Sequence, residues 1–190
     1  MATLGDAGVL ASGVRVGPLA PLQVAMAAPI MLFWLAYAVL GAFRRWMRAL
    51  DPTVLVGLQL MRVLGAAHLS TWGYGLMAGG FALPVAIGNF IVALVAIWAL
   101  RLTAYSLPGW RRAVVGLSVL GLAEFVMTFV LAVSGFLAVM TSLDPQIAPG
   151  GYASPVQLPL SIYPSYLIPL FTLIHFVTLV RVTAAYQDAV

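Results

Sequence analysis

Five long apolar runs alternate along this chain with short segments that are polar or rich in glycine and proline. Each run is close to the roughly 20 apolar residues that an α-helix needs to cross a bilayer. The pattern therefore predicts an all-α integral membrane bundle of five transmembrane helices. The predicted helices cover about residues 21–43, 53–71, 83–102, 113–140 and 162–182.

The remaining segments frame a single transmembrane domain over residues 21–182. Residues 1–20 form an N-terminal arm of small, mildly apolar residues, and residues 183–190 form a C-terminal tail. The longest connection, residues 143–161, is rich in proline and glycine, which favours a loop over a helix. We expect this loop to lie on the outer side of the membrane.

The arginines indicate the orientation of the predicted bundle. Seven of them flank alternate helix ends, namely Arg44, Arg45, Arg48, Arg101, Arg111, Arg112 and Arg181. Only Arg15 falls on the opposite side. Because arginine and lysine accumulate in cytoplasmic loops, we predict that the N-terminus is outside and the C-terminus is in the cytoplasm. The expected location is the cell (inner) membrane, which the chain crosses several times.

The composition supports a lipid environment and excludes several kinds of covalent link and metal site. Hydrophobic residues make up 63% of the chain and charged residues 7%, against roughly a quarter charged in soluble proteins. The absence of cysteine excludes disulfides, iron–sulfur clusters and covalently attached haem. The absence of lysine excludes a Schiff base to retinal or pyridoxal phosphate. The basic pI is explained by the arginines at helix ends, so we expect lipid and no nucleic acid as a partner.

Two charged residues interrupt the predicted helices at matching depths. Arg62 lies about ten residues into the second helix, roughly 15 Å from its cytoplasmic end. Glu124 lies about eleven residues into the fourth helix, which starts from the same side. A lone arginine at the bilayer centre costs about 2.5–3.5 kcal/mol on insertion scales, so a partner is expected. We predict that Arg62 and Glu124 pair, assisted by Gln59 one helical turn from Arg62.

This pair admits three interpretations. It can be a structural clamp that fixes the register of two helices. It can be a functional pair that responds to protons or anions. Alternatively, Arg62 can extend toward the interface without a fixed partner.

Small residues surround the polar positions on two other predicted helices. Asn89 shares a helical face with alanines, and Glu124 shares one with Gly121 and Thr128. Such faces let helices approach closely, so they are packing faces first and line a binding site only if the helices leave a gap. We take Arg62, Glu124, Gln59 and Asn89 as the candidate intramembrane polar network, with no catalytic or metal-binding residue assigned.

The two histidines, His68 and His175, are both embedded in predicted helices, which raises the possibility of a b-type haem. Counted along their helices, His68 lies roughly 24 Å and His175 roughly 9 Å from the cytoplasmic side. That mismatch is too large for two axial ligands of one upright haem. We expect hydrogen-bonded core histidines instead, with His68 near Asn89, and keep both as weak cofactor candidates.

Two stretches together resemble an uncharacterised family of bacterial polytopic membrane proteins. One runs from Arg62-Val-Leu-Gly65 to Phe81-Ala-Leu-Pro84-Val-Ala-Ile-Gly88-Asn89, and the other from Leu158-Pro159 through Pro164 and Pro169 to His175. The resemblance covers roughly residues 55–182. Those proteins tend to have Gly-Asp where this chain has Gly88-Asn89. The resemblance implies the fold and a bacterial membrane, and it implies no activity.

The sequence therefore favours a structural or accessory membrane protein that is a subunit or partner of a larger membrane complex, or that self-associates. A first alternative is a transporter or channel for a small solute or proton that uses Arg62, Glu124 and Asn89. A second is a protein that binds b-type haem or quinone. We lean against an enzyme, because no catalytic motif is present.

Overall fold

The computed structural model describes residues 21–75, 77–141 and 163–187, and the regular structure of these residues is entirely helical. The predicted arm over residues 1–20 and the predicted outer loop over residues 143–161 lie outside the described residues. The elements are α2 (Pro21–Val39), α3 (Gly41–Ala49), α4 (Pro52–Leu58), the 3₁₀ helix η1 (Gln59–Ala66), α5 (Ala67–Gly73), α6 (Gly79–Ala104), α7 (Trp110–Thr141), the π-helix η3 (Tyr163–Leu167) and α9 (Ile168–Gln187).

Within the described residues, four helical segments are long and apolar enough to cross a membrane. They are Pro52–Gly73, which joins α4, η1 and α5, then Gly79–Ala104, Trp110–Ala132 and Ser165–Thr183. The pair α2 and α3 passes the same test only when the two are counted as one bent span. The described residues therefore hold four candidate spans, or five with the bent pair.

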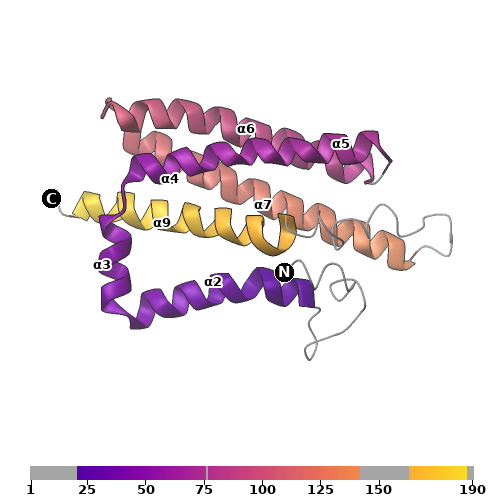
Figure 1. Ribbon diagram of the computed structural model, residues 1–190, viewed down its shortest axis with the longest axis horizontal. Coiled ribbons are helices and arrows are strands. Elements are labelled where there is room, and N and C mark those ends of the chain that lie inside the picture. The colour runs from indigo at the N-terminus through magenta and orange to yellow at the C-terminus, as the bar shows by residue number, and fades with distance from the viewer. Residues whose placement is uncertain (1–20, 76, 142–162, 188–190) are drawn as a thin grey trace.

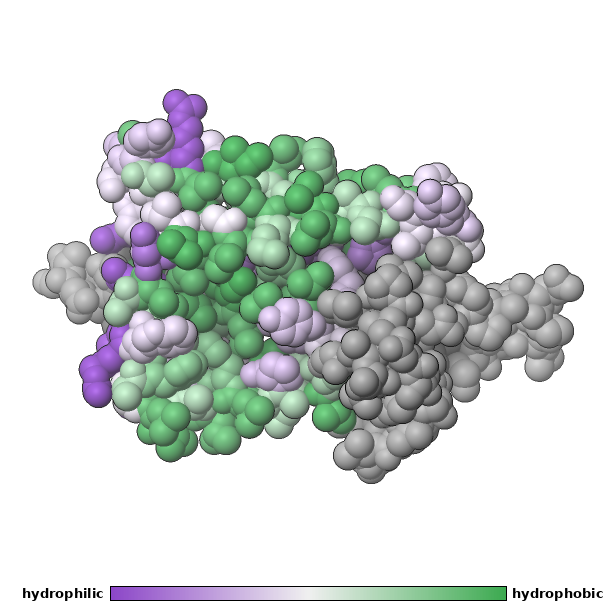
Figure 2. All heavy atoms as spheres, viewed as in Figure 1, coloured by the Kyte–Doolittle hydropathy of each residue, from purple (hydrophilic) through white to green (hydrophobic). Residues whose placement is uncertain are grey.

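The four straight segments lie side by side along the long axis of the molecule, and α2 runs along the outer side of α9 (Figure 1). Helix α6 contacts α7, η1 and α5, and α9 contacts α7, α4 and α2. The helix α3, the start of α4, the connection from α6 to α7 and the end of α9 share one end of the bundle. We call this the arginine end, because arginines lie in α3, in the last turn of α6 and in the first turn of α7. Hydrophilic residues gather there, while hydrophobic residues cover the helices (Figure 2).

The first predicted helix, over residues 21–43, differs from the structure. Helix α2 ends at Val39, and α3 leaves it at an angle of 105°. The Arg44 guanidinium folds back and donates to the carbonyl oxygens of Tyr37 and Ala38 at 3.0 and 2.7 Å. A cation there satisfies carbonyls that the end of a helix leaves unpaired. The bend keeps the charged residues of α3 at the arginine end.

The buried face of α6 carries small side chains along its whole length. The buried alanines on this face are Ala82, Ala86, Ala93, Ala96 and Ala99, and Asn89 lies in the middle of them. Small side chains let neighbouring helices approach closely, which is how transmembrane helices gain van der Waals contact. This close packing brings η1 and α7 to either side of Asn89.

Candidate functional site

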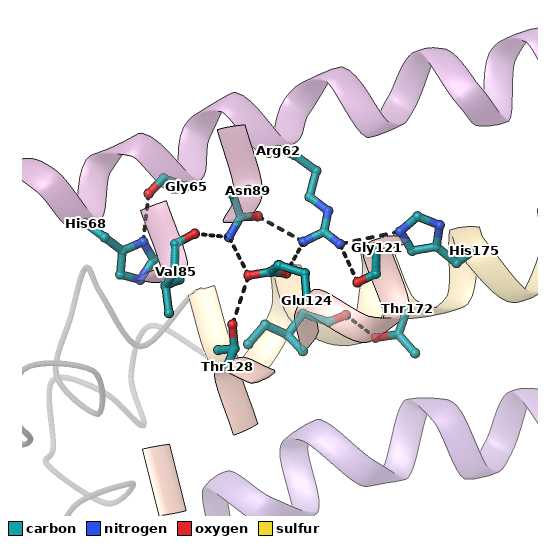
Figure 3. Close-up of polar contacts among 11 residues, drawn as sticks. Arg62, Gly65, His68, Val85, Asn89, Gly121, Glu124, Thr128, Thr172 and His175 are labelled. Atoms are coloured by element: carbon teal, nitrogen blue, oxygen red, sulfur yellow. Dashed lines mark hydrogen bonds and ion pairs between the residues drawn. The ribbon is translucent and has the colours of Figure 1, made fainter. Parts of the chain in front are cut away.

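Four helices each contribute one side chain to a buried polar cluster. Arg62 comes from η1, Asn89 from α6, Glu124 from α7 and His175 from α9. Figure 3 shows the Arg62 guanidinium between Asn89 and Glu124 on one side and His175 on the other. We call these four residues the polar cluster.

Arg62 is the centre of the polar cluster. Its Nη1 donates to Glu124 Oε2 at 2.6 Å and to Asn89 Oδ1 at 2.9 Å. Its Nη2 donates to the Gly121 carbonyl at 2.9 Å and lies 3.4 Å from His175 Nε2. The Arg62 side chain is 0% exposed and that of Glu124 is 4% exposed. The structure therefore brings together the two charges that the sequence pairs.

The second oxygen of the Glu124 carboxylate is also satisfied. Oε1 accepts from Asn89 Nδ2 at 3.0 Å and from Thr128 Oγ1 at 2.9 Å. Asn89 Nδ2 also donates to the Val85 carbonyl at 2.9 Å, which fixes the orientation of the amide. A buried charge pair balances its desolvation cost only when further hydrogen bonds complete both partners. Glu124 meets this condition.

Aromatic rings cover the guanidinium of Arg62. Its Cζ lies 3.9 Å from the centre of the Phe125 ring and 5.6 Å from that of Phe171. The negative face of an aromatic ring attracts a cation, and the attraction grows when water is excluded. These rings therefore stabilise the charge while closing the space around it.

Glycines let the backbones approach the polar cluster. A Cβ at Gly121 would overlap the His175 ring and lie 3.0 Å from Arg62 Nη2. A Cβ at Gly65 would lie 2.6 Å from Asn89 Cβ, and one at Gly88 would lie 2.8 Å from Glu124 Cγ. Two of these glycines belong to the stretches that carry the family resemblance, so the sequence contained this signal.

Two helical segments at or next to the polar cluster depart from α-helical geometry. Arg62 lies within η1, whose eight residues exceed the three or four usual for a 3₁₀ helix. The π-helix η3 precedes α9, near Pro169, which has no N–H to bond the residue 165 carbonyl. Such irregular turns often occur at functional sites or under strain. Here η1 carries Arg62 and η3 directly precedes the helix that carries His175.

His68 has a different partner from the one expected. Its Nδ1 donates to the Gly65 carbonyl at 2.9 Å, whereas the sequence analysis places it near Asn89. Its ring makes edge contacts with Tyr163 at 4.5 Å and Phe81 at 6.2 Å between ring centres. The reason is local: three residues separate His68 from Gly65, which is the reach of one helical turn.

His175 joins the cluster, which the sequence analysis did not anticipate. The predicted last helix ends near Arg181, whereas α9 continues to Gln187. His175 therefore lies deeper than expected and contacts Arg62. Because a guanidinium only donates, His175 accepts through Nε2, and this places its proton on Nδ1.

Several buried polar atoms beside the cluster have no hydrogen-bond partner in the part of the chain that the structure describes. They are both amide atoms of Gln59, Ser118 Oγ, Arg62 Nε and His175 Nδ1. Gln59 precedes Arg62 by three residues and Ser118 precedes Gly121 by three, on two helices that both begin at the arginine end. They therefore lie one turn from the Arg62–Gly121 contact, toward that end. Gln59 is as buried as expected but does not bond Arg62.

One ring nitrogen of each histidine faces a protein group: His175 directs Nε2 at Arg62, and His68 directs Nδ1 at the Gly65 carbonyl. Among the described residues, no three side chains of the metal-binding types gather at one place. The arrangement can hold a charge pair rigidly, and it can hydrogen-bond small polar molecules beside that pair.

A family model described as Domain of unknown function (DUF8737) matches residues 19–183. The chain belongs to this family. No curated protein and no solved structure matches the chain. Every polar-cluster residue falls inside the matched range, and the DUF8737 family has no assigned activity to transfer to it.

Proposed function

We propose that this chain is a multi-pass protein of the bacterial inner membrane that serves as a structural or accessory subunit of a larger membrane assembly. In this proposal the arginine end faces the cytoplasm and the N-terminus is outside, as the distribution of arginines predicts. The part of the chain that the structure describes has four to five segments that are long and apolar enough to support this arrangement.

The observation that carries the proposal is the enclosure of the Arg62–Glu124 pair. Both carboxylate oxygens and both terminal guanidinium nitrogens have protein partners, and phenyl rings cover the cation. A pair that transports a solute must exchange these partners for the solute in each cycle. A pair whose carboxylate oxygens and terminal guanidinium nitrogens are all bonded to protein groups is better suited to holding four helices in one register.

The outer surfaces of the helices leave room for a partner. Helix α2 contacts α9, η3 and α3, and its opposite side is exposed. Met31, Leu32, Leu35 and Val39 on α2 are between 60% and 70% exposed. In a bilayer such a face contacts lipid or another apolar helix, and close helix packing is the main source of association there.

The test uses affinity-tagged chain in its native membrane, extracted in mild detergent. We expect one partner to be retained at fixed stoichiometry by the wild type and by Arg62→Met/Glu124→Leu, which removes both charges together. We expect the single change Arg62→Met to lose it, because an unpaired buried charge disturbs the packing. The proposal fails if the wild-type chain elutes as a homogeneous species without a partner or a second copy.

The specific observation in favour of transport is the set of unpaired polar atoms on Gln59, Ser118 and His175. Buried polar groups normally bond water when protein partners are missing, so a small polar solute could bind there. Reconstituted liposomes decide between the two functions. Proton or solute flux that is abolished in a folded Glu124→Gln variant would establish transport and reject the accessory role.

A further inference from the structure

A groove opens at the arginine end between α6 and α7. It has a volume of about 410 Å³ and is open toward the surroundings of the bundle. Its walls are apolar side chains of both helices, including Val95, Trp98 and Leu102 on α6 and Leu117 on α7. Arg112 lies at its rim beside the connection between the two helices. A second, adjoining hollow shares Arg112 and is also lined by Arg111.

Gly116 forms part of the groove floor, and nothing lies within 4 Å of the place where its Cβ would be. The open space therefore continues along α7 below Arg112, one helical turn further from the arginine end. Trp98 is 56% exposed although it is large and apolar. An aromatic side chain at this depth is typical of the boundary between lipid chains and headgroups.

The charge of the rim has no compensation within the described part of the chain. The one ion pair found there joins Arg62 to Glu124, so neither Arg111 nor Arg112 has a carboxylate partner. Arg111 instead lies near the Trp110 ring, with its Cζ 5.5 Å from the ring centre. Arg112 lines both hollows and Arg111 lines the second, and guanidinium groups attract and bind phosphate well.

We propose that this groove binds an anionic phospholipid of the cytoplasmic leaflet. Arg111 and Arg112 hold the phosphate headgroup, and one acyl chain lies along Val95, Trp98 and Gly116. Charge complementarity selects the headgroup, and the apolar floor selects a lipid over a soluble phosphate. The inference rests on the proposed membrane orientation, because only then do the arginines lie at headgroup depth.

The experiment uses the purified full-length chain in detergent and measures lipid binding by native mass spectrometry. Phosphatidylglycerol is compared with phosphatidylcholine of identical acyl chains. We expect the first phosphatidylglycerol to bind more tightly, and Arg111→Gln/Arg112→Gln to weaken it by roughly tenfold. The matched control is Arg45→Gln/Arg48→Gln, which removes the same charge from α3 and should retain the affinity. Equal losses in the two variants would mean diffuse surface attraction and would overturn the site.

The groove itself is tested by Gly116→Leu, which keeps every charge. The leucine side chain should enter the open space without a clash and reduce binding of the first lipid severalfold. Binding equal to wild type overturns the groove as the place of the acyl chain. If this variant melts earlier than wild type, Trp98→Ala replaces it, because removing one groove wall should also weaken binding.

Two further measurements distinguish a failure of the lipid site from a failure of the proposed membrane location. Glycerol phosphate at millimolar concentration should not displace the lipid, and displacement would indicate a site for soluble phosphate instead. Recovery of the chain in the aqueous phase without detergent would reject the membrane proposal. A chain that needs detergent but shows no preference for the anionic lipid rejects only the lipid site.

Discussion

Arg62 and Glu124 are 62 positions apart in the chain, yet Arg62 Nη1 donates to Glu124 Oε2 at 2.6 Å. The contact joins η1 to α7, and both partners are buried. Removing one partner of such a pair leaves an uncompensated charge, whereas removing both leaves an apolar site. This asymmetry gives the first prediction.

Arg62→Met and Glu124→Leu should each lower the free energy of unfolding by about 3–5 kcal/mol, as is typical for breaking a buried ion pair. The double variant should be more stable than either single variant. Unfolding by denaturing detergent, followed by circular dichroism, measures all four proteins of the cycle. Additive losses in the double variant would show that the two side chains do not stabilise the fold through each other.

Gly121→Ala should destabilise the bundle by about 1–3 kcal/mol, the usual range for overpacking. The added methyl group would overlap the His175 ring, so α9 must move away from α7. Gly116→Ala on the same helix is the matched control, since nothing lies within 4 Å of its Cβ position. The control should be neutral or stabilised by up to about 1 kcal/mol. Equal effects at both positions would contradict the close contact at Gly121.

Gln59 and Asn89 form a natural comparison, because both are buried amides and only Asn89 has hydrogen-bond partners among the described residues. Asn89 bonds Arg62, Glu124 and Val85, so Asn89→Leu should cost about 2–4 kcal/mol. Gln59→Met should leave the free energy of unfolding unchanged or raise it, because its amide atoms have no described partner. A loss in Gln59→Met as large as that in Asn89→Leu would mean that a bound molecule satisfies the Gln59 amide.

The absence of cysteine makes the orientation directly measurable, since an introduced cysteine has no background. Tyr74 and Tyr105 are 82% and 74% exposed, and they follow the last residues of α5 and α6, at opposite ends of the bundle. A membrane-impermeant maleimide added to intact cells should label Tyr74→Cys only. Tyr105→Cys should react only after the membrane is permeabilised. The reverse pattern would show that the arginine end faces outward.

The family match shows the family of the chain and assigns no chemistry to it. It covers residues 19–183 and therefore includes every candidate span. The proposals on partner, lipid and orientation depend on the physical properties of named residues. Each can fail without affecting the all-helical fold.

The sequence by itself determined that the chain is helical and apolar enough to cross a membrane. An apolar run of that length in lipid must satisfy its backbone hydrogen bonds within the run, and a helix does so. The sequence also indicated the pairing of Arg62 with Glu124, since charges at equal depth in lipid require compensation. Each residue of a helix adds a fixed rise across the membrane, so counting residues from the helix ends is sufficient to predict that Arg62 and Glu124 lie at the same depth. Counting residues does not predict which neighbouring helix a side chain faces, or at which residue a helix ends.

Only the tertiary structure decided the remaining members of the cluster. His175 reaches Arg62 because α9 extends beyond Arg181 and because Gly121 leaves space for the ring. The bend after Val39 likewise depends on Arg44 bonding carbonyls at the end of α2. The contact between His175 and Arg62 joins residues 113 positions apart, so it arises from the packing of helices against each other, which no local pattern of residues specifies.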